Sequence, residues 1–311
     1  MSMYLCPALM DWLLYYVSFA VFYAAGERGV TLLACTLLGL ITQAAYMPGS
    51  VLAGSMLNTR NAKQILIWST AFSGLFAAFC LKLTGFWPLM GAMAGLGVAS
   101  AFFFNSFQTF MRSESSLGMT LKQTVSLYNL AWGMGAGAGC LTAGIIYAFG
   151  TWALIGTALA SIAVILWLLF THKSSTIPRD TPDGVIEEGS PSAPRVSPIY
   201  VIIGWTMIFT IQFVQRPLYV FLPADFAKTG MSSLPASLPL FAFMAVQSVF
   251  AFFLWHFRDQ LYRRTPFLIM QGLGVLAFAT IWIWPNYGIC LAMLSLLGLY
   301  SGFGFYSSIY Y

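Results

Sequence analysis

Long apolar runs separated by short polar segments follow one another along most of the chain. Each run is close to the roughly 20 residues that an α-helix needs to cross a bilayer. The pattern predicts ten membrane-spanning helices, because a helix satisfies its own backbone hydrogen bonds in lipid. The runs cover residues 11–26, 30–53, 64–83, 86–110, 123–148, 151–171, 199–222, 234–255, 266–284 and 287–311.

Residues 172–197 interrupt this pattern with serines, mixed charges and four prolines. Such a composition is typical of a flexible, solvated linker. It divides the chain into a six-helix bundle (1–171), a cytoplasmic polar linker (172–198) and a four-helix, incomplete bundle (199–311). The last run stops at Tyr311 without a basic flank or polar tail, so we expect the chain to be a fragment or a shortened gene product.

The basic residues predict the orientation of these helices, because cytoplasmic loops carry an excess of Lys and Arg. With the N-terminus inside, the inside loops hold ten of the 14 Lys and Arg residues and the outside loops hold four. We therefore expect a multi-pass protein of the cytoplasmic membrane with an inside N-terminus.

Composition agrees with a membrane protein, since 59% of the 311 residues are hydrophobic and 7% are charged. Soluble domains carry about 25% charged residues. We interpret the basic residues behind the net charge of +5 as topology signals. The sequence has no basic patch interleaved with exposed aromatics, so it does not predict a nucleic-acid partner. The expected surroundings are membrane lipid, and the expected oligomeric state is a monomer.

Two loops share a pattern. After the second run, Gly54 is followed by Asn58, Arg60 and Lys63. After the eighth run, Asp259 precedes Arg263 and Arg264 at the corresponding spacing. Related loops six helices apart indicate two pseudo-repeated halves.

Six helices, a polar linker and a second set of helices with this loop resemble the major facilitator superfamily. In that family the loop carries glycine, an Asp-Arg pair, a second glycine and two basic residues. Here Asn58, Thr59 and Asn61 depart from that pattern. The resemblance implies an all-α bundle with about ten of twelve helices present, and an inside gate formed by such loops. The gate candidates are Gly54, Asn58, Arg60, Lys63, Arg112, Asp259, Arg263 and Arg264. The alternative is that the basic residues serve as topology signals alone.

In the same family, helices one, four, seven and ten line a central cavity. Polar side chains on these helices are costly in lipid and tend to face the bundle interior. The cavity candidates are Tyr15, Tyr16, Tyr23, Asn105, Gln108, Gln212, Gln215, Arg216, Tyr300 and Tyr306. Asp11, Glu27 and Asp225 are expected at helix ends rather than near the centre of a span.

Glycines recur from Gly133 to Gly144 in the fifth run, with Gly135–Gly139 and Gly133–Gly137 at the four-residue spacing that lets helix backbones touch. Close helix packing is the interpretation that we prefer. The proline of the drug/proton antiporter motif is absent from this stretch, so antiport is not supported.

The function that these observations favour is secondary active or facilitative transport of a small solute by alternating access. A ten-helix drug/metabolite-type carrier and a non-transporting or decayed membrane protein are the alternatives. A membrane-embedded transferase is the least favoured, because no cluster of His, Asp or Glu marks a membrane face. No enzyme activity, cofactor or metal site is expected.

Overall fold

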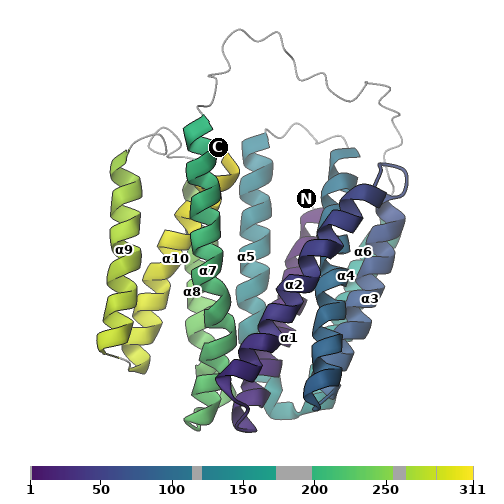
Figure 1. Cartoon of the computed structure of the whole chain (residues 1–311). Helices are drawn as coiled ribbons and strands as arrows, with labels where there is room; N and C mark the ends of the chain where they lie inside the picture. Colours follow the sequence, from purple (N-terminus) through teal and green to yellow (C-terminus); the bar gives the residue numbers. More distant parts are fainter. Residues whose placement is uncertain (1, 114–120, 173–197, 255–263, 285, 311) are drawn as a thin grey trace.

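A computed structural model describes residues 2–113, 121–172, 198–254, 264–284 and 286–310 of the chain (Figure 1). The described residues form α-helices joined by short turns. The α-helices are α1 (Leu5–Glu27), α2 (Leu32–Met56), α3 (Ala62–Lys82), α4 (Phe86–Ser113), α5 (Leu121–Ile146), α6 (Thr151–Thr171), α7 (Pro198–Lys228), α8 (Ser233–Phe253), α9 (Arg264–Ile283) and α10 (Tyr287–Tyr310). Short 3₁₀ helices, η1 (Ser2–Tyr4) and η2 (Tyr147–Phe149), precede α1 and follow α5.

The ten predicted helices are all present, which confirms the all-α bundle. Nine of the described helices are long and apolar enough to cross a membrane. Two boundaries differ most: α1 begins at Leu5 rather than near residue 11, and α7 ends at Lys228 rather than near residue 222. Asp11, expected at a helix end, therefore lies inside α1.

The helices stand side by side, and the two ends of the bundle can be told apart by the chain path (Figure 1). At one end, here named the linker end, α6 finishes and α7 begins. At the other, named the distal end, glycines with positive φ form the turns after α1, before α6 and after α7: Gly29, Gly150 and Gly230. Glycine suits these turns because it adopts positive φ without steric cost.

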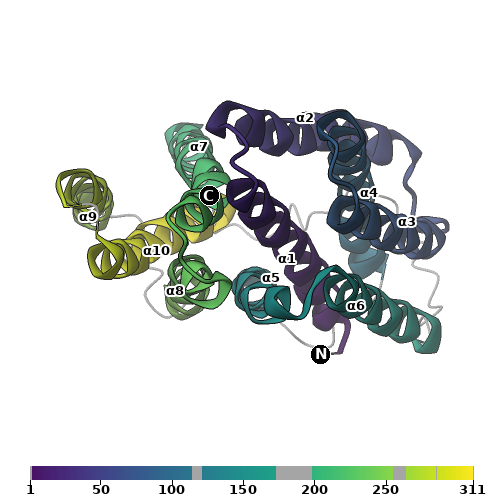
Figure 2. The same cartoon turned by 90° about the horizontal axis from the view of Figure 1, so that it is seen from below.

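Helix α1 occupies the middle of the bundle, between α2–α4 and α6 on one side and α7–α10 on the other (Figure 2). In its most hydrophobic 18-residue window, 67% of the residues are buried, against 11% for the corresponding window of α9 at the edge. Residues on α1 are therefore the best placed to contact helices from both parts of the chain.

Helix α5 joins α1 to α8 through two separate rows of glycines. A Cβ atom added at Gly135 or Gly139 would overlap backbone atoms of α1, at Ala8 and Trp12. Additions at Gly133 and Gly144 would overlap serine side chains of α8 instead. The glycine-rich stretch thus brings α5 into close contact with two helices at once, as its spacing predicts.

Large aromatic side chains are exposed near both ends of the bundle. Trp87, Trp152 and Trp282 are 73%, 73% and 87% exposed toward the distal end, and Trp167 is 63% exposed toward the linker end. Lys82 places its ammonium group 4.4 Å from the centre of the Trp152 ring. Exposed tryptophans at two levels are typical of the two interfaces of a membrane.

Candidate functional site

A buried carboxylate on α1 marks the centre of the candidate site. Asp11 is 2% exposed, and the Trp132 indole of α5 is placed to donate to it. Its Oδ2 atom is buried and accepts no hydrogen bond from a described residue. An ionisable group buried inside a membrane bundle is costly, so it marks a candidate functional site.

Helix α7 presents an arginine to the same region. Arg216 is half-buried, and its Nε donates a 2.9 Å hydrogen bond to Oε1 of Gln212, one helical turn earlier. Asp11 and Arg216 interact electrostatically, although they form no direct ion pair in the described part of the chain. Asp11 and Arg216 therefore lie near each other, one on an N-terminal helix and one on a C-terminal helix.

Two tyrosines complete this region, which we name the central site (Asp11, Tyr15, Tyr46, Trp132, Gln212 and Arg216). Tyr15 of α1 and Tyr46 of α2 each interact electrostatically with both Asp11 and Arg216. Tyr15 also packs edge-to-face on Tyr219 of α7, with ring centres 4.7 Å apart. This ring pair lies one turn nearer the distal end than Asp11 and Gln215, so it covers the central site on that side.

Next to the central site, Gln215 joins α7 to α8. It is 1% exposed, and its Nε2 lies 2.6 Å from the Tyr219 hydroxyl and 3.3 Å from Oε1 of Gln247. Gln215 Oε1 and Asp11 Oδ2 are thus both buried without a hydrogen-bond partner among the described residues.

The other cavity candidates lie at different places in the bundle. Tyr16 donates to the Leu154 carbonyl of α6, and Asn105 donates to the Ser50 hydroxyl of α2 at 2.9 Å. Tyr300 packs on α9, Tyr306 is buried in a separate cluster with Met207 and Phe303, and exposed Gln108 reaches Tyr128. The structure brings Tyr15, Gln212 and Arg216 together. Gln108 is linked to this region through Tyr128, which interacts electrostatically with Asp11, and the other four lie apart.

The distal end is closed by contacts between the N-terminal and C-terminal helices. Tyr23 of α1 donates a 2.7 Å hydrogen bond to the Met231 carbonyl, and Ser233 donates one of 2.7 Å to the Gly144 carbonyl. A Cβ atom at Gly26 would overlap the carbonyl oxygen of Ala224. The backbones of α1 and α7 therefore touch at this end.

The loop between α2 and α3 is held by its own asparagines. Asn58 Oδ1 accepts from the backbone of Arg60 and Asn61, while Asn61 Oδ1 accepts from the Asn58 backbone. Lys63 Nζ donates a 2.8 Å hydrogen bond to the His172 carbonyl at the end of α6. No side-chain neighbour lies within 4 Å of a Cβ added at Gly54. Asp259 and Arg263, together with the side chains of Arg112 and Arg264, lie outside the described residues.

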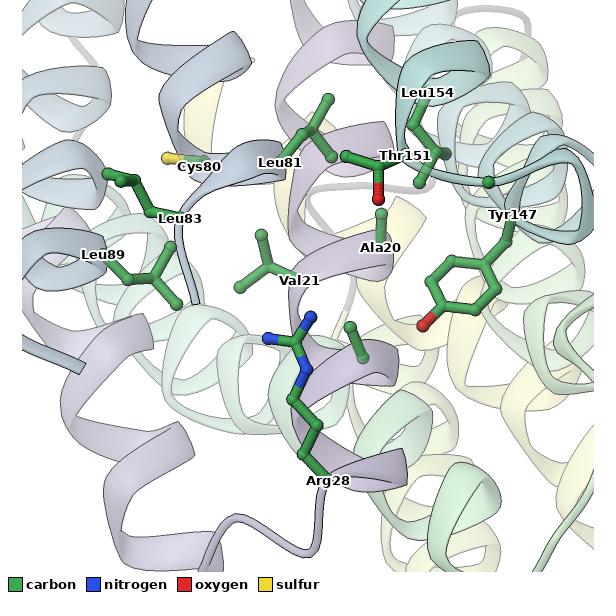
Figure 3. A pocket seen from close by; sticks show the side chains of 12 residues that line it. Ala20, Val21, Arg28, Cys80, Leu81, Leu83, Leu89, Tyr147, Thr151 and Leu154 are labelled. Carbon is green, nitrogen blue, oxygen red and sulfur yellow. The ribbon is translucent and has the colours of Figure 1, made fainter. Parts of the chain in front are cut away.

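A cavity of about 170 Å³ opens near the distal end within the N-terminal helices. Figure 3 shows the Arg28 guanidinium directed toward Val21, with Leu89 and Leu154 on the surrounding walls. All of the lining residues come from the segment Ala20–Leu154. The cavity therefore lies apart from the interface with α7–α10 and from the central site. No group of three or more potential metal ligands gathers among the described side chains.

Comparison with known proteins decides the family. The Major Facilitator Superfamily model matches residues 2–311, which is nearly the whole chain. The chain belongs to the major facilitator superfamily. A five-plus-five drug/metabolite carrier is thereby excluded, and the transport of a small solute across a membrane is the function that the family supports. No curated protein matches the chain by sequence.

Solved structures of this superfamily share the fold. A D-xylose-proton symporter matches with a TM-score of 0.66 at 17% identity, covering 96% of this chain and 79% of the symporter chain. A bacterial homologue of the human lysosomal transporter Spinster, inward-facing and occupied, matches with a TM-score of 0.66 at 16% identity. That match covers 98% of this chain and 72% of the homologue. At these identities the likeness establishes the superfamily fold.

Sequence reasoning missed Asp11, Tyr46, Trp132 and Tyr219. Tyr46 and Trp132 lie on the second and fifth helices, which the family pattern does not assign to the cavity. The signal for Asp11 was present, because residues 5–10 before it (Leu-Cys-Pro-Ala-Leu-Met) are as apolar as the run that follows. Extending the first helix to Leu5 would have placed the carboxylate within the span.

Proposed function

We propose that this chain carries a small polar solute across the cytoplasmic membrane by alternating access through the central site. The observation that carries the proposal is the placement of Asp11 and Arg216 on opposite sides of the interface between the N-terminal and C-terminal helices. A solute bound between them contacts both side chains. When the N-terminal and C-terminal helices rock against each other, the bound solute becomes accessible first from one side of the membrane and then from the other.

The distal contacts support the closed side of such a cycle. The Tyr23–Met231 hydrogen bond and the Gly26–Ala224 backbone contact join α1 to α7 and to the start of α8. Each contact is small, which favours reversible separation. The solute passes through without chemical conversion.

The orientation that we propose has the N-terminus and the linker inside the cell. Arg60 and Lys63 lie at the linker end, whereas Arg28, Lys82 and Lys228 lie at the distal end. The charges before α3 and in the linker follow the positive-inside rule. We also propose that a monomer is sufficient, because the central site is formed within one chain.

Uptake into proteoliposomes tests the function. The full chain is reconstituted and screened with radiolabelled polar solutes, and Asp11→Asn and Arg216→Gln are compared with the wild type. Both substitutions should lower uptake by at least roughly 10-fold, because each removes a charged group that the bound solute contacts. Gly91→Ala is the control, since a Cβ at Gly91 has no neighbour within 4 Å. Unchanged uptake in both variants would contradict the assignment of the central site.

A further inference from the structure

Asp11 and Arg216, the acidic and the basic residue of the central site, form no direct ion pair with each other. Asp11 Oδ2 is buried without a hydrogen-bond partner, while the Trp132 indole of α5 is placed to donate a hydrogen bond to the same carboxylate. An unpaired buried carboxylate is costly, so a cationic ligand group that pairs with it binds more favourably than a neutral group does.

Arg216 is oriented by a neutral side chain of its own helix, which leaves its positive charge uncompensated. The bond from Nε to Gln212 fixes one edge of the planar guanidinium, and no hydrogen bond joins its Nη atoms to a described residue. A guanidinium held in this way offers two parallel N–H groups, which match the two oxygens of a carboxylate.

Tyrosine side chains lie near the two charges. Tyr15 of α1 and Tyr46 of α2 are each close enough to Asp11 and Arg216 to interact electrostatically with both. The Tyr15–Tyr219 ring pair covers the side toward the distal end. A ligand bound between Asp11 and Arg216 meets an anion, a cation and tyrosine side chains together.

We propose that the central site selects zwitterionic solutes of the amino-acid type, with the ammonium group on Asp11 and the carboxylate on Arg216. This inference rests on the proposed transport function and names its substrate class. A neutral or singly charged solute leaves at least one protein charge unpaired, and that penalty provides the discrimination. A zwitterion also leaves the loaded site with no added net charge, which lowers the cost of moving it through the membrane interior.

Ligand-dependent thermal unfolding of the purified full-length chain tests the inference. The probes are glycine, alanine, glutamine, leucine and phenylalanine, each with its methyl ester and its N-acetyl derivative. Ligands that bind the folded state raise the melting temperature in proportion to occupancy. At least one free amino acid should stabilise the wild type, with an affinity at least roughly 10-fold higher than that of its ester or N-acetyl derivative.

Substitutions at Asp11 and Arg216 test which group of the ligand each residue binds. Asp11→Asn should remove the preference for the free amino acid over its N-acetyl form, and Arg216→Gln should remove the preference over the ester. Arg216→Lys keeps the charge and should retain part of the second preference. Equal stabilisation by the derivatives, or no stabilisation by any amino acid, overturns the inference. If a sugar or another neutral solute is transported and its uptake depends on Asp11 and Arg216, the transport function stands and the zwitterion assignment is wrong.

Discussion

Tyr23 donates a 2.7 Å hydrogen bond to the Met231 carbonyl, and this bond joins α1 to the turn before α8 at the distal end. The Tyr23 ring also packs edge-to-face on Tyr147, whose hydroxyl donates to Glu27. One side chain thus connects the N-terminal and C-terminal helices where they close.

Tyr23→Phe is therefore expected to open the distal end more often without unfolding the protein. The lost bond is worth about 1 kcal/mol, which corresponds to roughly a fivefold change in the open population. The readout is the labelling rate of a cysteine introduced at Ser233, which is 8% exposed in the closed distal end, in a background where the five native cysteines are buried. A labelling rate equal to that of the Tyr23 parent would show that the bond does not control closure.

Gly139→Ala should destabilise the whole bundle, because the added Cβ overlaps the Trp12 carbonyl and lies 3.0 Å from the Tyr16 backbone nitrogen. Backbone atoms cannot rotate away, so we expect a loss of about 1–3 kcal/mol in the free energy of unfolding. Thermal unfolding in detergent measures it. Gly91→Ala on α4 is the matched control, and it should be neutral or slightly stabilising.

Asn105→Ala should weaken the packing of α4 on α2 and leave solute recognition unchanged. Its amide donates to Ser50 at 2.9 Å, and hydrogen bonds between membrane helices average about 0.6 kcal/mol. The two measurements are the melting temperature and the KM for an identified solute. A raised KM at normal stability would indicate that Asn105 lines the solute cavity, as its position in the sequence predicted.

Lys63→Met should lower the melting temperature more than Arg60→Met does. Lys63 ties the loop before α3 to the His172 carbonyl, whereas Arg60 is exposed and its side chain forms no contact among the described residues. Hydrogen bonds to charged groups contribute about 1.5–3 kcal/mol. Both variants remove one inside charge, so equal effects would indicate that these residues act as topology signals alone.

Much of the fold could be predicted from the sequence, because helix length and polar interruptions are set by the bilayer. The runs 151–171 and 266–284 match α6 and α9 closely. The first helix was predicted to begin too late because its start was placed at the charged Asp11, although the apolar residues 5–10 before it continue the run. Asp11 was misplaced as a result.

The direction in which each side chain points was harder to predict. Tyr15 and Tyr16 are neighbours on one helix, yet Tyr15 reaches α7 and Tyr16 reaches α6. Membrane helices are apolar on all sides, so no contrast between polar and apolar faces marks the interior. The partner of each tyrosine follows from helix rotation, which is fixed by contacts such as Gly135 on Ala8.

The glycine row of α5 that faces α8 has a consequence for motion. Gly133, Gly137 and Gly144 leave gaps on that surface of α5, and α8 side chains such as Ser248 and Ser237 occupy them. Side chains that interlock must change rotamer before two helices can slide past each other, and each change adds to the energy barrier. Because the α5 glycines have no rotamers to change, only the α8 side chains contribute to this barrier, so we expect α8 to shift along α5 more readily than two helices that interlock with large side chains on both faces.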